Sequence, residues 1–204
     1  MRIRTHTNPF NYYQKMDHIS VTDMVKDPSL PLDLEIGFGR GRFLRHWSRK
    51  YSNRNIIGVE VRKNITELLQ RRLIQDNLTD NTYAIHGSGE RVLEDIIDDG
   101  ILDTIFVFHP DPWFKKKHHK RRFIRPDIVN LMAKKLKPEG YLHLSTDVIP
   151  LWEAMLETME NTSSFTKLEN HSFWKEDYTS HWHEFSERDK RSLNWMSFKK
   201  TLGV

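Results

Sequence analysis

A carboxylate held between two prolines is the residue of this chain best suited to do chemistry. Asp111 lies in HPDPWFKKKHHKRRF, residues 109–123, together with six Lys or Arg residues, three histidines and no second acid. Pro110 and Pro112 restrict the backbone on both sides of the carboxylate. The cations that begin at Lys115 could bind phosphates, with an affinity that depends on salt. We interpret Asp111 as a candidate active-site acid beside a surface for a polyanion.

The same stretch also has a purely structural explanation. A basic run is usually a solvated face of a protein, and Trp113 could be a core residue instead of offering, with Phe114, a surface on which a base stacks. The functional interpretation is favoured because Asp111 directly follows a predicted strand, at the end where ligands bind in parallel sheets.

A second group of candidate residues lies in LEIGFGRGRFL, residues 34–44, which combines the carboxylate of Glu35 with Gly37, Gly39 and Gly41. Glycine lets the backbone approach a ligand without interference from a Cβ atom. A dinucleotide-binding loop would place its third glycine where Arg42 stands, so the pattern favours a nucleoside cofactor without phosphates, such as S-adenosylmethionine. The alternative is that the glycines only form a tight turn.

Two further strand ends carry polar residues that suit an adenosine. Glu60 closes IIGVEV, where a carboxylate can accept hydrogen bonds from both ribose hydroxyls, and Arg62 follows within reach of the nucleoside. Ser88 and Gly89, in HGSGERVL, could meet the adenine through a hydroxyl and a backbone amide. A solvated strand end at Glu60 and a plain turn at 86–89 are the structural alternatives.

These residues need a scaffold that brings strand ends together. Segments rich in β-branched or aromatic residues predict buried parallel strands at 32–37, 56–61, 82–86, 104–108 and 141–146. Helical periodicity separates them at 41–50, 64–76, 89–98 and 126–136, and LKPEGY, 136–141, indicates a helix end followed by a turn. A helix at about 150–161 and strands near 165–169 and 194–200 follow. The alternation predicts a parallel sheet with helices on both faces and right-handed crossovers.

The composition predicts a single domain over residues 1–204, with residues 1–30 as an N-terminal arm. The absence of cysteine excludes disulfides and thiol chemistry and fits a reducing cytoplasm. With 32 Lys and Arg against 28 Asp and Glu the formal net charge is only +4, yet the cations concentrated at 115–125 permit a polyanionic partner. No apolar run is long enough to span a bilayer, so we expect a cytoplasmic protein without membrane contact, as a monomer or homodimer.

The eleven histidines raise the question of a metal site, above all at His118, His119, His181 and His183. Structural and catalytic zinc sites use cysteines or histidines at helical spacing, such as the His-Glu-x-x-His pattern. Neither is present, so we predict no catalytic metal.

Taken together, RTHTNPF, LEIGFGRGRFL, IIGVEVRK, HPDPWFKKKHHKRRF and LSTD make the chain resemble the tRNA (guanine-N7)-methyltransferase family over most of its length. The resemblance implies a Rossmann-like class I methyltransferase fold, with a seven-stranded, mostly parallel sheet. It also implies transfer of a methyl group from S-adenosyl-L-methionine to N7 of a guanine in the variable loop of tRNA.

By this resemblance Glu35, Gly37, Glu60 and Arg62 contact S-adenosylmethionine, and Ser88 takes a third cofactor position where the family commonly has an acid or amide. Asp111 is then the active-site acid, and Lys115 and Asp147 contact the substrate, although an acid at 147 is also an ordinary residue at a helix N-terminus. The family's late Thr-x-x-Glu motif has its nearest counterpart in SERD, which assigns Ser186 and Asp189 to the substrate. SHWH, 180–183, is the weaker counterpart.

Asp111 suits this chemistry. Guanine N7 has a free lone pair, so its methylation needs positioning and electrostatics more than a general base. A carboxylate near the donor's sulfonium can hold the N1–H and amine edge of the base and offset the positive charge that develops on the ring. Two rival functions remain open, a methyltransferase for another RNA or a small molecule and a catalytically silent RNA-binding module.

Overall fold

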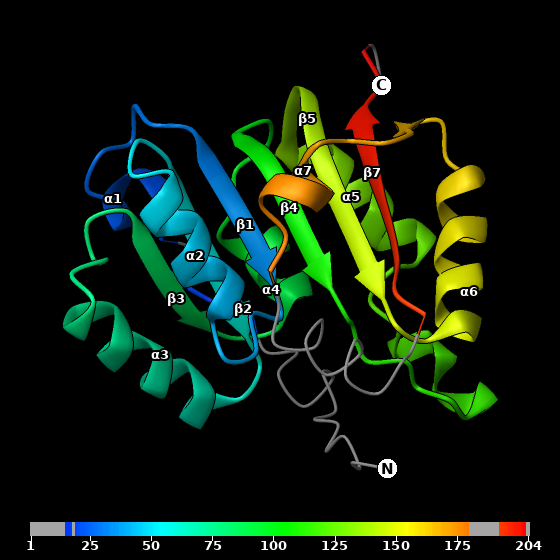
Figure 1. The fold of residues 1–204 in the computed structure, drawn as a ribbon, viewed down its shortest axis with the longest axis horizontal. Helices are drawn as coiled ribbons and strands as arrows, with labels where there is room; N and C mark the ends of the chain where they lie inside the picture. The colour runs from blue at the N-terminus through cyan, green and yellow to red at the C-terminus, as the bar shows by residue number, and fades with distance from the viewer. Residues whose placement is uncertain (1–14, 18, 180–191, 203–204) are drawn as a thin grey trace.

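A seven-stranded sheet runs through the middle of the molecule, with helices on both sides (Figure 1). The structure, a computed structural model, describes residues 15–17, 19–179 and 192–202. Its elements follow in the order α1 (Val21–Met24), β1 (Leu32–Ile36), α2 (Arg42–Lys50), β2 (Asn55–Glu60), α3 (Lys63–Gln75), β3 (Thr82–His86), α4 (Gly89–Asp95), β4 (Leu102–Phe108), the 3-10 helix η2 (Lys116–Arg121), α5 (Pro126–Lys135), β5 (Leu136–Thr146), α6 (Ile149–Glu160), β6 (Phe165–Leu168), α7 (Phe173–Glu176) and β7 (Asn194–Lys200).

The strand order is β3-β2-β1-β4-β5-β7-β6. β1 pairs in parallel with β2 and β4, and β3 and β5 extend this parallel core on its two sides. β7 runs antiparallel between β5 and β6. The predicted seven-stranded, mostly parallel sheet is therefore confirmed.

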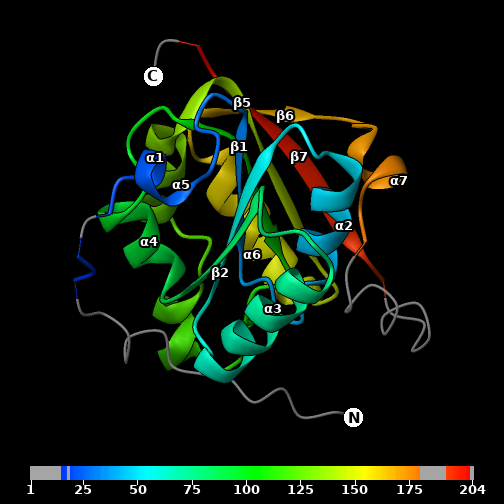
Figure 2. The same ribbon diagram turned by 90° about the vertical axis from the view of Figure 1, so that its left-hand side faces the viewer.

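The apolar side chains of the strands alternate between two hydrophobic clusters, as the period of two in a strand requires. In β4, Ile105 and Val107 belong to the cluster that also contains residues of α4, α5 and α6, whereas Phe106 and Phe108 belong to the cluster with α2, α3 and α7. Figure 2 shows α1, α4 and α5 on one side of the sheet and α2 and α7 on the other. Helices on both faces leave the ends of the parallel strands as the places open to a ligand.

The predicted strands and the five longer helices are confirmed, with boundaries that differ by up to five residues. Sequence patterns missed α1, η2 and α7, because elements of four to six residues are too short to show periodicity. α5 ends at Lys135, one residue before its predicted end, and the expected turn in LKPEGY lies inside β5. There the register to β4 shifts, and Glu139 adopts a left-handed φ of 63°.

Part of the predicted N-terminal arm packs on the sheet. Val21 and Val25 are buried in the cluster with α4, α5 and α6, and the backbone N–H of Met16 donates to Asp95 in α4. A single domain over the whole chain stays a prediction. Among the described residues, no helix combines the length and apolar character needed to cross a membrane.

Candidate functional site

The predicted site lies where the strand order reverses. From β1 the chain moves to β2 and β3 on one side, and it then returns from β3 to β4 on the other side of β1, so the direction of the crossovers reverses at β1. In such sheets a crevice forms beyond the carboxyl ends of the strands, and ligands bind in it. β1, β4 and β5 all point towards the lower side of the molecule in Figure 1. Of the predicted acids, Asp111 and Asp147 lie in the segments that follow β4 and β5.

The turn from β1 to α2 is built from glycines in left-handed conformations. Gly37, Gly39 and Gly41 have φ angles of 76°, 54° and 67°, which residues with a Cβ rarely adopt. A Cβ at Gly37 would meet no atom of the described residues within 4 Å, whereas one at Gly41 would lie 2.4 Å from Leu69 in α3. Gly37 is therefore not required by packing within the described part of the chain, and Gly41 lets α2 and α3 pack closely.

Glu35 is buried in β1, and its carboxylate is only partly hydrogen-bonded. Its Oε2 atom has no hydrogen-bond partner in the described part of the chain. Burial, reinforced by the nearby negative charge of Glu60, raises the pKa of Glu35 to about 8, and a hydrogen bond from the backbone N–H of Leu44 lowers it only in part. A cation placed beside this carboxylate would relieve the cost of burying its charge.

Glu60, at the end of β2, is held side-on by Arg62 and by the glycine turn. The Nε and Nη2 atoms of Arg62 donate to the two carboxylate oxygens at 3.0 and 2.9 Å, and the backbone N–H of Gly39 donates to Oε2 at 3.1 Å. These bonds tie the end of β2 to the turn after β1. In this structure Arg62 therefore binds the carboxylate of Glu60. A ribose that approached Glu60 would take a place beside the guanidinium on the same carboxylate.

Asp111 lies within electrostatic reach of the same cluster. The hydrogen bonds from Arg62 to Glu60 contribute most to raising the pKa of Arg62, and the negative charge of Asp111 adds to the effect. Asp111 is half-buried. On its two sides His109 and Trp113 have left-handed φ angles of 49° and 45°, so the chain bends sharply around the acid. The segment after β4 thus turns Asp111 toward the residues at the end of β2.

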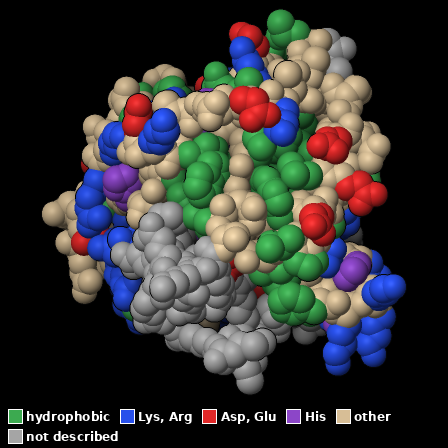
Figure 3. All heavy atoms as spheres, turned by 45° about the vertical axis from the view of Figure 1, so that its right-hand side comes forward, with side chains coloured by type: hydrophobic (Ala, Val, Ile, Leu, Met, Phe, Trp, Pro, Cys, Tyr) green, Lys and Arg blue, Asp and Glu red, His purple; other side chains and the backbone are tan. Residues whose placement is uncertain are grey.

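The basic run after Asp111 divides into a packed part and an exposed part. Trp113 is buried, with the guanidinium of Arg121 5.0 Å from its ring centroid, so it packs and is not a free stacking surface. Phe114 is 66% exposed, and Lys115 is exposed at the start of η2. Figure 3 shows Lys, Arg and His side chains gathered at the lower right, at the level at which β4 and β5 end. This end of the molecule suits a polyanion.

Asp147 follows β5, but it does not cap α6. The N-cap residue is Val148, so the interpretation of Asp147 as an ordinary helix-terminal acid is not supported. Its side chain is fully buried, and its Oδ1 lies 3.3 Å from Nδ1 of His109. A buried carboxylate with a specific partner fits a functional or positioning role better than a solvated one.

The residues after β3 are explained mainly by packing. A Cβ at Gly89 would lie 2.7 Å from Ile36 and 3.1 Å from Phe123, so a glycine is needed there whether or not a ligand binds. Ser88 is buried at the N-cap of α4, where its side chain makes no capping hydrogen bond. The contact of Ser88 and Gly89 with an adenine stays a prediction.

Sequence reasoning missed Tyr178, which lies shortly after α7. Its hydroxyl is 2.9 Å from Nε2 of His109 and 3.0 Å from Oγ of Ser145. Nothing in the aromatic segment around Tyr178 distinguishes it from a core residue. A histidine at the end of the apolar β4 was the one available signal, because a buried imidazole needs polar partners.

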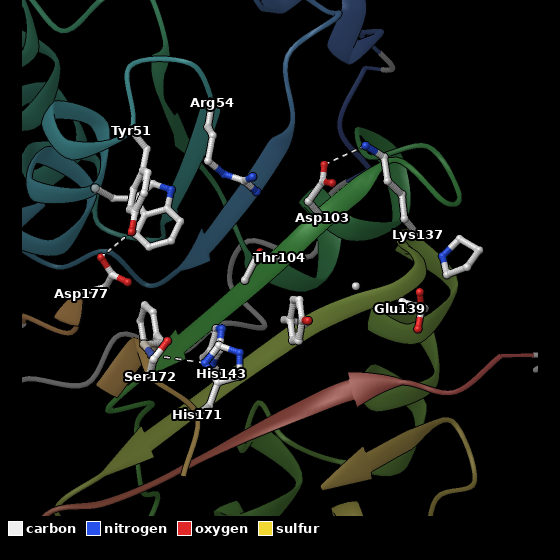
Figure 4. Close-up of a pocket in the computed structure, with 15 residues that line it drawn as sticks. Tyr51, Arg54, Asp103, Thr104, Lys137, Glu139, His143, His171, Ser172 and Asp177 are labelled. Carbon is white, nitrogen blue, oxygen red and sulfur yellow. Dashed lines mark hydrogen bonds and ion pairs between the residues drawn. The ribbon is translucent and has the colours of Figure 1, made fainter. Parts of the chain in front are cut away.

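A separate pocket of about 340 Å³ opens on the side of the sheet covered by α2 and α7, near the starts of β4 and β5 (Figure 4). Its charged side chains are paired with neighbours. Arg54 donates to the buried Asp33, and Lys137 donates to Asp103. The pocket lies at the opposite end of these strands from the predicted site.

Some predicted residues lie outside the described part of the chain. They are Ser186, Asp189, His181, His183 and the segment RTHTNPF. Among the residues that the structure describes, no group of three or more His, Asp or Glu residues could hold a metal ion.

Comparison with known proteins places the chain among methyltransferases. The sequence model of a family described as "Putative methyltransferase" matches residues 29–200. A tRNA (guanine-N(7)-)-methyltransferase of Prochlorococcus marinus is 34% identical over 176 residues, which are 84% of this chain and 84% of that protein. A protein of the same name from Nitrosococcus oceani is 39% identical over 138 residues, 67% of this chain and 58% of the relative.

Solved structures with little sequence identity share the fold. An antibiotic-related methyltransferase has a TM-score of 0.59 at 14% identity, over 93% of this chain and 97% of that one. The aminoglycoside resistance methyltransferase NpmB1 has a TM-score of 0.57 at 14% identity, over 93% and 95% of the two chains. These likenesses confirm the predicted Rossmann-like class I methyltransferase fold.

Proposed function

The chain belongs to the tRNA (guanine-N(7)-)-methyltransferase family, and from this membership we propose that it transfers a methyl group from S-adenosyl-L-methionine to N7 of a guanine in tRNA. The proposed site lies over the carboxyl ends of β1, β2 and β4. Its guanine is that of the tRNA variable loop, and the protein acts in the cytoplasm as a monomer or homodimer. The absence of cysteine and the kind of substrate support this compartment.

The Oε2 atom of Glu35 has no hydrogen-bond partner among the described residues, and it lies next to the glycine turn at Gly37; this observation carries the assignment of the cofactor site. S-adenosylmethionine bears an ammonium and a sulfonium, so it supplies the positive charge that a buried carboxylate with a raised pKa lacks. The residues present therefore fit the cofactor. We assign Glu35, Gly37 and Gly39 to its amino-acid part and sulfonium.

The nucleoside of the cofactor is assigned to the neighbouring strand ends. Glu60, with Arg62 beside it, accepts the ribose hydroxyls, and Ser88 and Gly89 lie at the adenine. The hydrogen bond from the backbone N–H of Gly39 to Glu60 supports this assignment, because it holds the glycine turn next to the acid assigned to the ribose. Ser88 follows β3, and its side chain makes no capping hydrogen bond to α4 that would compete with an adenine.

Asp111 is assigned to the reacting base. When bound, S-adenosylmethionine supplies an electrophilic methyl group on a sulfonium. Asp111 accepts hydrogen bonds from the N1–H and amine edge of the guanine, which orients N7, and its charge offsets the positive charge that the ring gains. No general base is needed, since N7 carries no proton. The electrostatic influence of Asp111 on Arg62 supports its position at the cofactor side.

Substrate contacts are assigned to Lys115, Asp147, Ser186 and Asp189. The exposed cations of η2 and the exposed Phe114 support an RNA over a small molecule as acceptor, because phosphates and an unstacked base are what such groups bind. Asp147 and the basic run follow neighbouring strands, β5 and β4.

Methyl transfer to an unmodified tRNA transcript, followed by mapping of 7-methylguanine, tests the function. We expect one modified guanine, and Asp111→Asn should lower kcat by about 10² or more while the melting temperature changes little. Asp127→Asn, an exposed acid in α5, is the control and should keep full activity. Folded wild type that leaves tRNA unmodified, or that prefers another RNA or a small acceptor in competition, would overturn the proposal. RNA binding without cofactor binding in calorimetry would indicate a silent RNA-binding module.

A further inference from the structure

A buried imidazole joins the ends of β4 and β5. His109 is the first residue after β4, and its side chain is fully buried. Its Nδ1 lies 3.3 Å from Oδ1 of Asp147, and its Nε2 lies 2.9 Å from the hydroxyl of Tyr178. That hydroxyl is 3.0 Å from Oγ of Ser145. Four side chains from three segments therefore form one chain of hydrogen bonds.

The order of the protons follows from the chemistry of the groups. An ionised Asp147 only accepts hydrogen bonds, so Nδ1 of His109 donates to it, and Nε2 of the neutral ring accepts from Tyr178. The Tyr178 hydroxyl can then accept from the hydroxyl of Ser145. Each hydroxyl on this path donates once, so all four groups are satisfied together.

The backbone of His109 is also tied to the end of β5. His109 has a left-handed φ of 49°, which few residues other than glycine adopt, although histidine and asparagine do so more often than most, and its N–H donates to the carbonyl of Ser145 at 2.8 Å. A phenyl ring could fill the same volume, but it would leave the buried carboxylate of Asp147 without this partner. A neutral imidazole has one donor and one acceptor nitrogen on a rigid ring, so it can join a carboxylate to a phenol.

We propose that His109 is a positioning residue for the substrate RNA. It holds the buried carboxylate of Asp147 in place at the end of β5, the segment to which substrate contact is assigned, and Tyr178 holds the imidazole from its other side. The proposal rests on the proposed function and on the substrate role assigned to Asp147. Because Asp111 is only two residues after His109, the same bridge sets the distance between the acid at the reacting base and the acid at the end of β5.

A double-mutant cycle on methyl transfer tests the proposal. His109→Asn suits the left-handed backbone, because asparagine tolerates positive φ, but removes the bridging ring. We expect kcat/KM for tRNA to fall about ten- to a hundredfold, mainly through KM, while the affinity for S-adenosylhomocysteine stays constant. If His109 acts through Asp147, the double variant His109→Asn/Asp147→Ala should be no worse than Asp147→Ala alone. If the losses of kcat/KM in the two single variants multiply in the double variant, the proposal is overturned.

Tyr178→Phe gives a second test that keeps the ring packed against Phe108 and Trp174. It should reproduce the KM effect of His109→Asn in weaker form. Tyr141→Phe, a tyrosine toward the other end of β5, is the matched control and should leave kcat/KM unchanged. An unaffected Tyr178→Phe variant would contradict the role given to this hydroxyl.

Nitrogen-15 NMR of the imidazoles tests the bridge, that is, the hydrogen bonds of His109 to Asp147 and Tyr178, independently of the proposed function. We expect the Nδ1–H tautomer for His109, and Asp147→Ala should abolish that preference. If wild type shows this tautomer but does not methylate tRNA, the proposed function fails and the bridge stands. If wild type methylates tRNA and His109 shows the other tautomer, the positioning role fails by itself.

Discussion

At the scale of single residues, the site depends on a buried carboxylate whose charge is not balanced by a neighbouring cation in the described part of the chain. Glu35 has a pKa near 8 instead of 4.5, so between these values the native state binds more protons than the unfolded chain. The free energy of unfolding therefore falls as the pH rises from about 4.5 to about 8. A residue that lowers stability in this way is expected at a binding site, where a ligand restores the balance.

Glu35→Gln should remove both the loss of stability at high pH and part of the binding of the cofactor. The amide has no charge to bury, so the variant should gain on wild type in the free energy of unfolding as the pH rises to 8, on the order of 3 kcal/mol, and should lose affinity for S-adenosylhomocysteine. Urea unfolding at pH 5 and pH 8.5 and calorimetry at pH 8.5 measure the two quantities. Glu67→Gln, an exposed acid of α3, serves as the control. A variant that follows the pH dependence of wild type would contradict the argument.

The acids of the candidate site can be picked out from the sequence because they lie in or near the carboxyl-terminal halves of predicted strands. Glu35 lies within β1, Glu60 ends β2 and Asp111 follows β4 by three residues. The structure brings Glu35, Glu60 and Arg62 close together. The partners of these residues could not be predicted. Tyr178 is 69 residues from His109, and such a contact depends on how side chains pack and not on a local pattern.

At the scale of elements, the turn between β1 and α2 separates two uses of glycine that look identical in sequence. Gly37 and Gly41 both have left-handed φ angles, but only Gly41 is pressed against a neighbouring helix. Spacing alone predicted the turn correctly. It could not show that Gly41, and not Gly37, is required to make room for Leu69, because that distinction depends on the packing of α3.

Three alanine variants test this difference. Gly41→Ala should lose the most stability, because its Cβ would lie 2.4 Å from Leu69, in addition to about 1–2 kcal/mol of left-handed strain. Gly37→Ala should lose only the strain, but it should also weaken binding of S-adenosylhomocysteine. Gly100 has a φ of 68° and no described atom within 4 Å of its Cβ position, so Gly100→Ala measures the strain alone, away from the site. Thermal unfolding and calorimetry compare the three, and equal stability losses would contradict the packing argument.

At the scale of the whole molecule, the alternation of strands and helices made the fold the most predictable property. Apolar strands of five or six residues separated by periodic helices leave few arrangements besides a parallel sheet covered on both faces. Sequence patterns did not predict the order of the last strands, in which β7 inserts between β5 and β6. The pairing of β7 is a choice between sheet edges, which no local signal specifies.

The distribution of charge over the molecule leads to the last prediction. A net charge of +4 is small, so binding of RNA must come from the cations that gather near the ends of β4 and β5, and not from a general attraction. Lys116→Ala/Lys120→Ala, in exposed positions of η2, should weaken tRNA binding and reduce the slope of log K against log salt by about one for each phosphate that is no longer neutralised. Fluorescence anisotropy between roughly 50 and 200 mM salt measures the slope.

Lys134→Ala/Lys167→Ala removes the same charge from α5 and β6, where both lysines pair with acids. This control should keep both the affinity and the slope of wild type. If the two double variants weaken binding and flatten the slope equally, net charge and not the position of η2 governs RNA binding. An effect confined to the η2 variant would mean that the element following Asp111 brings the tRNA backbone to the strand ends, where the guanine can reach the acid.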